Sequence, residues 1–407
     1  MGDLTATAGA PAWARALAAT LVMQTTASLA TRVLPVLGPA ITLAAGVPPE
    51  SIGHLAAAVA LGTMWFLMSG VPLLNRLGPV RLLQLGGAIG VVALVLATSG
   101  YWPLLLVAAF LIGVAYGPSP PAGSDILNRH APKGHRSLVF SVKQSGVPLG
   151  GAIAGLMAPA VAGLWGWQAG LLSAALVIAA SVLMVQPLRS ELDAGRRRED
   201  RITFATLLSP KCFVAPFRSF GMAPGMVALT VAGFSFAMVQ GAVFSFYVTY
   251  LAADLGFGLV AAGAAFAVMQ GVGVGSRVLV GWVADRIGSA RKTLTVLALA
   301  SATMATVIAF HGADWPWALI MIAAGVSGVA VASWNGVYLS EIARIAPPDK
   351  VGEATSGTGF FSFLAYAISP SLCSLIVAST GSYRIAFLVV ATAPLVAAFL
   401  LARARGD

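Results

Sequence analysis

The chain has 407 residues, of which 9% are charged and 58% are hydrophobic, and its formal net charge is +10. A soluble domain carries about 25% charged residues, so this composition excludes a soluble enzyme, a secreted disulfide scaffold and a disordered protein. It indicates a polytopic membrane protein. The two cysteines, Cys212 and Cys373, lie far apart in the sequence and form neither a metal-binding nor a redox spacing.

Apolar runs follow one another along the whole chain, and a helix needs about 20 such residues to cross the hydrocarbon core of a membrane. None of the runs shows the alternation of a membrane β-strand. We therefore predict an all-α fold with twelve transmembrane helices. The first run lacks a preceding basic segment, so we expect no cleaved signal. The runs cover residues 14–43, 51–74, 80–100, 103–127, 138–163, 167–187, 222–251, 259–283, 293–311, 316–342, 354–379 and 383–402.

The basic residues predict the orientation of these helices. If the N-terminus is cytoplasmic and the helices alternate, twenty of the 24 lysines and arginines lie in cytoplasmic segments, and the outer segments hold only Arg384. Lysine and arginine are enriched on the cytoplasmic side of membrane proteins. We therefore predict cytoplasmic N- and C-termini and a multi-pass protein of the inner, cytoplasmic membrane. The positive net charge is a signal of this topology and not of nucleic-acid binding.

A charged stretch at residues 188–221 separates the first six runs from the last six. We interpret it as a cytoplasmic linker between two six-helix bundles, residues 1–187 and 222–407. A motif before the linker also recurs 210 residues later. The two copies are Asn75-Arg76-x-Gly78-x-x-Arg81 and Asp285-Arg286-x-Gly288-x-x-Arg291. Parallel six-helix repeats are a transporter architecture, with the binding site near the midplane at their interface.

The second copy lies in a longer segment, Gly281–Lys292, with the sequence GWVADRIGSARK. This segment resembles the signature loop between helices 8 and 9 of the major facilitator superfamily. The copy between helices 2 and 3 is altered, with Val71 for the first glycine and Asn75 for the aspartate. The resemblance covers the whole chain in span count, linker and repeat, and it implies the 6+6 fold and alternating access. A fold alone does not define a substrate.

Three cations lie inside predicted spans: Arg32 in helix 1, Lys143 in helix 5 and Arg277 in helix 8. An ionisable residue there costs several kcal/mol and needs a reason. In a structural interpretation, Arg32 pairs with Glu50 or a carbonyl, Lys143 extends to the cytoplasmic interface, and Arg277 bonds helix carbonyls or an acid of an inner gate. In a functional one, at least two of them line a central cavity and bind an anion. Because its planar fork donates two parallel hydrogen bonds, arginine suits a carboxylate.

Two short patterns around the arginines are similar to small-anion carriers. Arg277-x-x-x-Gly281-x-x-x-Asp285 resembles helix 8 of the oxalate–formate exchangers and monocarboxylate transporters, in which an arginine at this place binds the substrate carboxylate. The monocarboxylate pattern also has an acid one turn earlier, where this chain has Gly273. The sequence RVLPVLGP, which begins at Arg32, resembles the first helix of the cyanate-permease-like group. These resemblances imply a carboxylate anchor at Arg277 and a second cation at Arg32.

We expect the substrate to contact Arg277 as the main anchor, Arg32 as a second cation and Lys143 as a third or accessory cation. Further candidates for the cavity are polar or aromatic residues inside the spans. They are Gln24, Gln144, Gln270, Tyr116, Tyr247, Trp334 and Asn335.

Charged residues also gather at the predicted cytoplasmic ends of the helices. Asp125 and Arg129 are four residues apart and Glu341 and Arg344 three, so each pair can meet on one helix face. We interpret the cluster as the ion-pair network of an inner gate, with a direct proton relay as the alternative. Its members are Asp285, Arg286, Arg291, Arg76, Arg81, Asp125, Arg129, Glu341 and Arg344.

The leading functional prediction is a secondary transporter that moves a small organic anion, with a carboxylate as the expected class, by alternating access. The alternative is efflux of a drug or lipophilic compound by proton antiport, which predicts a buried acid in the cavity. A membrane enzyme or scramblase would need a catalytic constellation inside the spans, and three cations disfavour a neutral-sugar permease. The expected partners are the anion, protons or a counter-anion, and the lipid bilayer. We expect no nucleic acid, cofactor or metal, and a monomer.

Overall fold

The computed structural model describes residues 11–132, 135–193, 215–347 and 350–403. The first group of helices, which we call the N-half, consists of α1 (Ala12–Val36), α2 (Gly38–Ala44), η1 (Pro49–Ser51), α3 (Ile52–Ser69), α4 (Val71–Leu77), α5 (Pro79–Ala97), α6 (Trp102–Tyr116), α7 (Ser119–His130), α8 (Arg136–Trp165), α9 (Trp167–Val185), η3 (Gln186–Leu188) and α10 (Arg189–Leu192). The second group, the C-half, consists of η4 (Ala215–Gly221), α13 (Met226–Thr249), η5 (Tyr250–Asp254), α14 (Leu259–Ile287), α15 (Ala290–Ala309), α16 (Trp317–Ala332), α17 (Trp334–Ile345), α18 (Val351–Thr380) and α19 (Tyr383–Arg403).

The described segments confirm the predicted all-α transmembrane fold. Among them, eleven helical segments are long and apolar enough to span a membrane, and the bent pair α1–α2 makes a twelfth if it is one span. These two helices meet at 57°. Pro35 and Pro39 lie on either side of the bend, and neither can donate the backbone hydrogen bond that would continue the helix. Most of the predicted linker, residues 194–214, lies outside the described residues.

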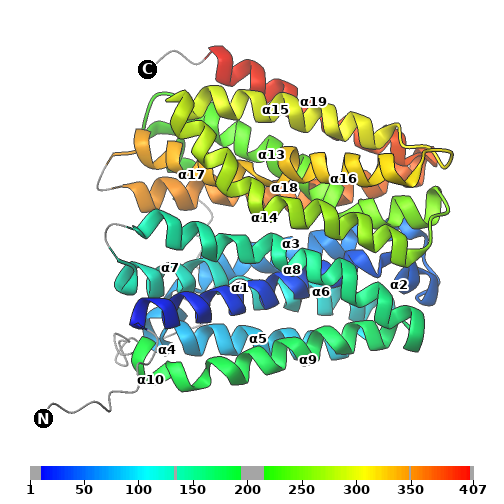
Figure 1. The fold of residues 1–407 in the computed structure, drawn as a ribbon, viewed down its shortest axis with the longest axis horizontal. Helices are drawn as coiled ribbons and strands as arrows, with labels where there is room; N and C mark the ends of the chain where they lie inside the picture. Colours follow the sequence, from blue (N-terminus) through cyan, green and yellow to red (C-terminus); the bar gives the residue numbers. More distant parts are fainter. Residues whose placement is uncertain (1–10, 133–134, 194–214, 348–349, 404–407) are drawn as a thin grey trace, which may run out of the picture.

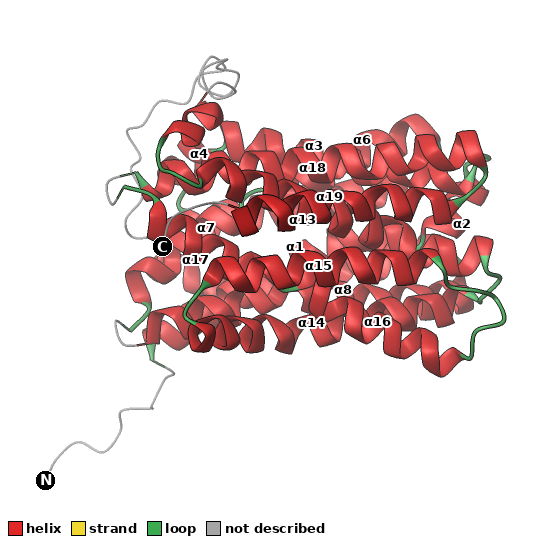
Figure 2. Ribbon diagram, turned by 90° about the horizontal axis from the view of Figure 1, so that it is seen from above, coloured by secondary structure: helices red, strands yellow, loops and turns green. Residues whose placement is uncertain are grey.

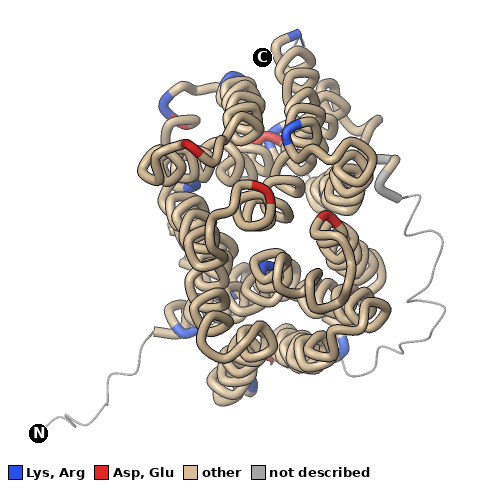
Figure 3. The backbone as a smooth tube through the Cα atoms, turned by 90° about the vertical axis from the view of Figure 1, so that its right-hand side faces the viewer, with Lys and Arg blue, Asp and Glu red and all other residues tan. Residues whose placement is uncertain are grey.

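The two halves lie side by side with their helices along the long axis of the molecule (Figure 1). The start of α1 and the end of α19 lie at the same end, which we call the terminal end, and α2 lies at the opposite, distal end (Figures 1 and 2). Seen along the helices from the distal end, both halves carry few charged residues (Figure 3). The hydrocarbon core of a membrane favours such weakly charged helices. Each helix satisfies its own backbone hydrogen bonds, and its apolar side chains can face lipid.

A glycine with positive φ occupies the turn in each copy of the repeated motif. Gly78 separates α4 from α5 with φ of 86°, and Gly288 ends α14 with φ of 68°. Only glycine adopts positive φ without a steric penalty. The backbone of these turns therefore explains why both copies keep a glycine.

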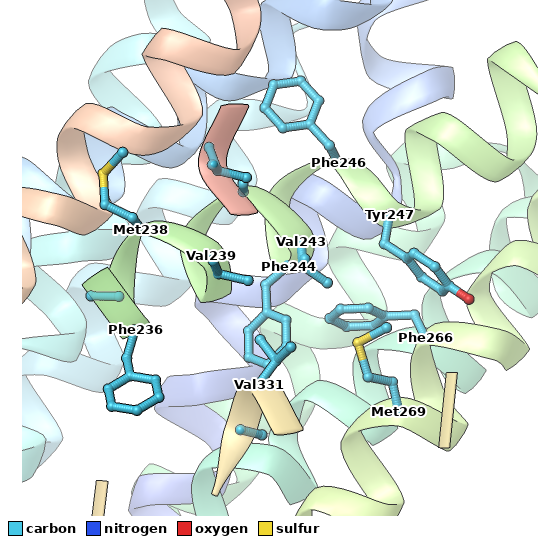
Figure 4. Close-up of a cluster of buried hydrophobic side chains, with 14 of the residues drawn as sticks. Phe236, Met238, Val239, Val243, Phe244, Phe246, Tyr247, Phe266, Met269 and Val331 are labelled. Atoms are coloured by element: carbon cyan, nitrogen blue, oxygen red, sulfur yellow. The ribbon is translucent and has the colours of Figure 1, made fainter. Parts of the chain in front are cut away.

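The core of the C-half forms around α13, which has mainly apolar side chains on all sides. From Ser235 onward every residue of this helix is buried. Phe244 meets Phe266 of α14 edge to face, with ring centroids 5.8 Å apart, and Met269 and Val331 complete the cluster from α14 and α16 (Figure 4). A helix that is apolar all round belongs in the interior of a bundle.

The halves meet most closely near the distal end, where glycines let two pairs of helices approach. Between α8 and α14, a Cβ added to Gly155 would lie 2.6 Å from the carbonyl oxygen of Gly263. Between α3 and α18, a Cβ added to Gly53 would overlap the carbonyl of Pro370 and the hydroxyl of Ser374. Small residues allow such backbone contact between membrane helices. We call these two contacts the distal seam.

Candidate functional site

The central helices α1 and α13 change from exposed to buried along their length. On α1, Ala18 is exposed and Leu21 is partly exposed, but Thr25, on the same face, is only 8% exposed. On α13, Val227 is exposed and Ala228, Val231 and Phe234 are partly exposed, and every residue from Ser235 onward is buried. Because α1 packs against α13 and against helices of its own half, we infer that these exposed stripes face a space between the halves that opens at the terminal end.

Arg32 of α1 lies deep in this space and remains partly exposed. Its guanidinium carbon is 4.7 Å from the centre of the Phe244 ring on α13, a distance at which a cation is attracted to an aromatic face. The buried Nε atom has no hydrogen-bond partner among the described residues. The structural alternative, a pair with Glu50, is absent from the ion pairs of the described chain. Arg32 thus links the halves while part of its donor capacity is unused.

Arg277 of α14 is held by two backbone carbonyls. Its Nη1 donates to the carbonyl of Gln144 on α8 and its Nε to the carbonyl of Ala332, each at 3.1 Å. Both acceptors are available because their helices are interrupted: Pro148 follows Gln144 by one turn and has no N–H, and α16 ends at Ala332. The predicted contact with helix carbonyls is therefore observed, and it uses two of the five N–H groups of the guanidinium.

Two tyrosines lie within electrostatic range of both arginines. Tyr116 ends α6 and Tyr366 lies on α18, and each phenol interacts with Arg32 and with Arg277. The two guanidinium groups also affect one another. The amide nitrogen of Gln24 donates to the hydroxyl of Tyr116 at 3.4 Å. Side chains from both halves therefore meet at one place, although the residues are spread over most of the sequence.

An amide fixes the position of one of these phenols. The Oε1 atom of Gln240 on α13 accepts a hydrogen bond from the hydroxyl of Tyr366 and another, at 3.1 Å, from the indole Nε1 of Trp334. Trp334 stacks on Phe236, with ring centroids 5.2 Å apart and planes 10° from parallel. Because an indole N–H only donates, it sets which end of the amide is the oxygen. Sequence reasoning predicted Trp334 but missed Gln240, Tyr366 and the ring of Phe244.

The comparison with protein-family models assigns the chain. Residues 17–370 match the model of the Major Facilitator Superfamily. The chain belongs to this superfamily. The resemblance predicted from the repeated motif is therefore confirmed at the level of the superfamily, and the multi-pass membrane architecture follows from it.

Relatives of this superfamily member are transporters, and the family points to a transport role rather than to an enzyme. An uncharacterised MFS-type transporter of Mycobacterium tuberculosis is 25% identical over 361 residues, which are 88% of this chain and 78% of the relative. A shorter stretch of 147 residues is 29% identical to the 4-hydroxybenzoate transporter PcaK of Pseudomonas aeruginosa and covers 35% of this chain and 32% of that protein.

Solved structures of the superfamily share the fold. A bacterial homologue of the lysosomal transporter Spinster, in an inward-facing and unoccupied conformation, superposes with a TM-score of 0.73 at 15% identity over 97% of both chains. The peptide transporter POT in complex with sulfate superposes with a TM-score of 0.75 at 16% identity, over 97% of this chain and 94% of that one. At these identities the likeness shows the fold alone.

Lys143 of this superfamily member contacts a different set of residues from the arginines. Its side chain is 2% exposed. The Nζ atom donates to the carbonyl of Ser119, the first residue of α7, at 3.4 Å and to Oε1 of Gln144 at 3.3 Å. The structural interpretation expected Lys143 to extend to the cytoplasmic interface. Its buried Nζ atom shows that it does not.

Three other predicted residues lie in separate surroundings. Gln270 is buried beside Gly151 on α8, and both polar atoms of its amide lack a partner among the described residues. The ring of Tyr247 packs against His311, with centroids 6.2 Å apart. Asn335 is partly exposed and follows Trp334 on α17.

The predicted gate residues lie near the terminal end. Arg129 bonds Asp125 on α7, and Arg344 bonds both oxygens of Glu341 on α17 at 2.7 and 2.8 Å. Each of these pairs joins residues of one helix, as their spacing predicts. Asp285 is exposed at the end of α14. Other predicted members are Arg76 at the end of α4, Arg81 at the start of α5, Arg286 over the ring of Trp282, and Arg291 on α15.

Proposed function

We propose that this chain is a secondary transporter of a small organic anion, and that a carboxylate is the group it binds. One observation carries the proposal: Arg32 and Arg277 come from different halves and lie close enough together for their charges to act on one another. Their contacts are a ring and backbone carbonyls, and the ion pairs of the described chain include neither residue. Two like charges in a region of low dielectric repel each other, and an anion between them offsets that repulsion.

The neighbouring groups suit the second oxygen and the body of such an anion. The hydroxyl of Tyr116 lies near both arginines and accepts from Gln24, so its own O–H can donate to an oxygen that the guanidinium groups do not bind. Tyr366 also lies near both arginines, but its hydroxyl already donates to Gln240. Because Arg32 belongs to the N-half and Arg277 to the C-half, a bound anion attracts the two halves toward each other. A ligand that contacts both halves can favour their rearrangement in alternating access.

The chemistry of the relatives supports the same class of substrate. PcaK is named a 4-hydroxybenzoate transporter, and we propose aromatic and short aliphatic carboxylates as the first probes. We keep the likeness to oxalate–formate exchangers, monocarboxylate transporters and cyanate-permease-like carriers as part of this proposal. Drug–proton antiport needs a buried acid near the substrate. The buried acids among the described residues are Asp193 and Glu341, and Arg344 binds Glu341.

We further propose that the terminal end faces the cytoplasm and that the protein is a monomer of the inner membrane. The two bundles would comprise residues 1–187 and 222–407, with residues 188–221 between them on the cytoplasmic side. The charged cluster at the terminal end would then close the cytoplasmic entrance in the opposite conformation. In this structure Asp285 of the cluster is exposed, which is consistent with an open entrance at the terminal end.

The test is binding and flux with purified protein. Benzoate, 4-hydroxybenzoate, lactate and oxalate, with uncharged benzamide as the matched neutral compound, are screened by the shift of the melting temperature. Positive compounds are then followed by counterflow in proteoliposomes. We expect a carboxylate to stabilise the wild type and Arg384→Ala, a variant at the distal surface, but not Arg277→Ala. Stabilisation by benzamide alone, or equal stabilisation of Arg277→Ala, would refute the carboxylate site.

A further inference from the structure

Lys143 is a buried cation without a function in the proposed anion site. It is 2% exposed, and its two hydrogen bonds go to a backbone carbonyl and an amide oxygen, both uncharged. The ion pairs of the described chain do not include it. A buried ammonium without an anionic partner is costly, so this site needs a chemical explanation.

The number of acceptors matches the neutral amine better than the ammonium. An ammonium carries three N–H donors and has no lone pair, but the structure gives Nζ two acceptors, the carbonyl of Ser119 and Oε1 of Gln144. A neutral amine has two N–H groups, which these acceptors satisfy. Lysine also loses its proton more readily than arginine when it is buried. The conformation with the terminal end open therefore favours Lys143 without its proton.

The helices that pack against α8 carry few groups that could replace Lys143 in this role. These helices are α1, α7, α9 and α14, and α9 has no titratable side chain. The charged or titratable groups on the other three are Arg15 and Arg32 on α1, Asp125, Arg129 and His130 on α7, and Arg277, Asp285 and Arg286 on α14. Asp125 is the acid nearest to the lysine along α7, two residues after Gly123, which faces the Cε atom of Lys143. Arg129 binds this acid.

Gln144 joins the lysine to the anion site. Its Oε1 atom accepts from Nζ of Lys143, and its backbone carbonyl accepts from Nη1 of Arg277. A movement of Arg277 when an anion binds therefore shifts the residue that holds the amine. Lys143 and Gln144 are neighbouring positions of α8, which packs against α1 of its own half and α14 of the other.

We propose that Lys143 is the proton-carrying group of the transport cycle. This role rests on the proposed function: one proton moves with each monoanion, so that the loaded carrier gains no net charge. The lone pair of Nζ takes the proton from water when the distal end is open. The ammonium gives the proton up to water at the terminal end before it reaches the buried position seen here, in which the neutral amine bonds Ser119 and Gln144.

The first test needs no substrate. In a background with Cys212→Ser and Cys373→Ser, cysteines at Glu50 and Ser374 report closure of the distal seam, because the hydroxyl of Ser374 donates to the carbonyl of Glu50 at 2.6 Å. We expect the crosslinking yield to fall as the pH is lowered, since acid protonates the amine and disfavours this conformation. The ratio of the two amine forms changes about tenfold per pH unit, so the yield should follow a single titration.

Variants of the lysine decide between outcomes. Lys143→Met and Lys143→Gln should give a high yield at every pH, and Lys143→Arg, which stays charged, a low yield at every pH. Asp125→Asn removes a charge of the gate cluster and can change the yield at neutral pH, but the yield should still fall as the pH is lowered. If Lys143→Met responds to pH as the wild type does, or if Asp125→Asn abolishes the response, the lysine is not the proton carrier.

The second test measures flux of 4-hydroxybenzoate in proteoliposomes. Wild type should accumulate the anion when the inside is made alkaline, whereas Lys143→Met should exchange it across the membrane without responding to the pH difference. Accumulation by Lys143→Met at the wild-type level would overturn the proposal. If neither the wild type nor any variant binds a carboxylate, the anion site is refuted instead. The crosslinking test then still decides the role of Lys143.

Discussion

Replacing Arg277 with lysine tests the central geometric argument, because it keeps the charge and removes the planar fork. A guanidinium can give a carboxylate two parallel charge-assisted hydrogen bonds, whereas an ammonium acts as a point charge. Each such bond contributes about 1.5–3 kcal/mol. The loss of one bond should therefore weaken anion binding about 10- to 100-fold. The substitution also removes the donors to the carbonyls of Gln144 and Ala332, so we expect a lower melting temperature as well.

The assay is isothermal titration of 4-hydroxybenzoate into purified protein. The matched control is Arg384→Lys, which makes the same chemical change at a guanidinium that lies over the ring of Phe310, 3.8 Å from its centre. Size-exclusion profiles establish that both variants are folded. If Arg277→Lys binds the anion within about twofold of the wild type, a difference below about 0.5 kcal/mol, the guanidinium does not act through its fork and the reasoning fails.

Four further predictions concern the gates and the packing. Gly53→Ala should disfavour closure of the distal seam by about 1–3 kcal/mol because the added methyl overlaps α18, whereas Gly271→Ala, which has open space, should leave seam crosslinking unchanged. Asp285→Asn should increase seam crosslinking and slow turnover more than it weakens binding, and unchanged values of both would contradict the gate. Burial lowers the pKa of His311 in the loop before α16, so the unfolded chain binds the proton more readily and the melting temperature should fall as the pH drops below about 6.5, an effect that His311→Phe should remove. Trp334→Phe keeps the aromatic stack and loses its hydrogen bond, which should lower the free energy of unfolding by about 1 kcal/mol in a denaturant titration.

The transmembrane helices were predictable because lipid leaves the chain little choice. A span must be apolar over its whole length, so it is visible in composition without knowledge of its neighbours. The arginines were predictable for the same reason, since a charge such as Arg277 stands out in an apolar run. The repeated motif also aligned Gly78 with Gly288, and both have positive φ.

The surroundings of the arginines were less accessible from the sequence. Packing among all the helices decides which faces of α13 and α18 meet. Gln240 and Tyr366 could therefore not be assigned to the site from the sequence. An amide inside an apolar span, such as Gln240, is nevertheless a signal that sequence analysis can use. A polar group inside an apolar span does not always belong to the site: the hydroxyl of Tyr247 led to its prediction, but its ring packs against His311. One contact was within reach: Pro148, one turn after Gln144, marks a carbonyl that lacks its helical donor.

The glycines of the distal seam have a consequence for the speed of the transport cycle. Where two side chains interlock at a contact, closing the contact restricts their rotamers and opening it frees them again. For a long side chain the lost rotamer freedom costs about 1–2 kcal/mol of free energy. At Gly155 and Gly263 one backbone meets another, and there are no rotamers to restrict. The two backbones can therefore separate and meet again without any side chain having to find its place. The α8–α14 contact of the distal seam is thus a surface that can separate and close many times with little repacking.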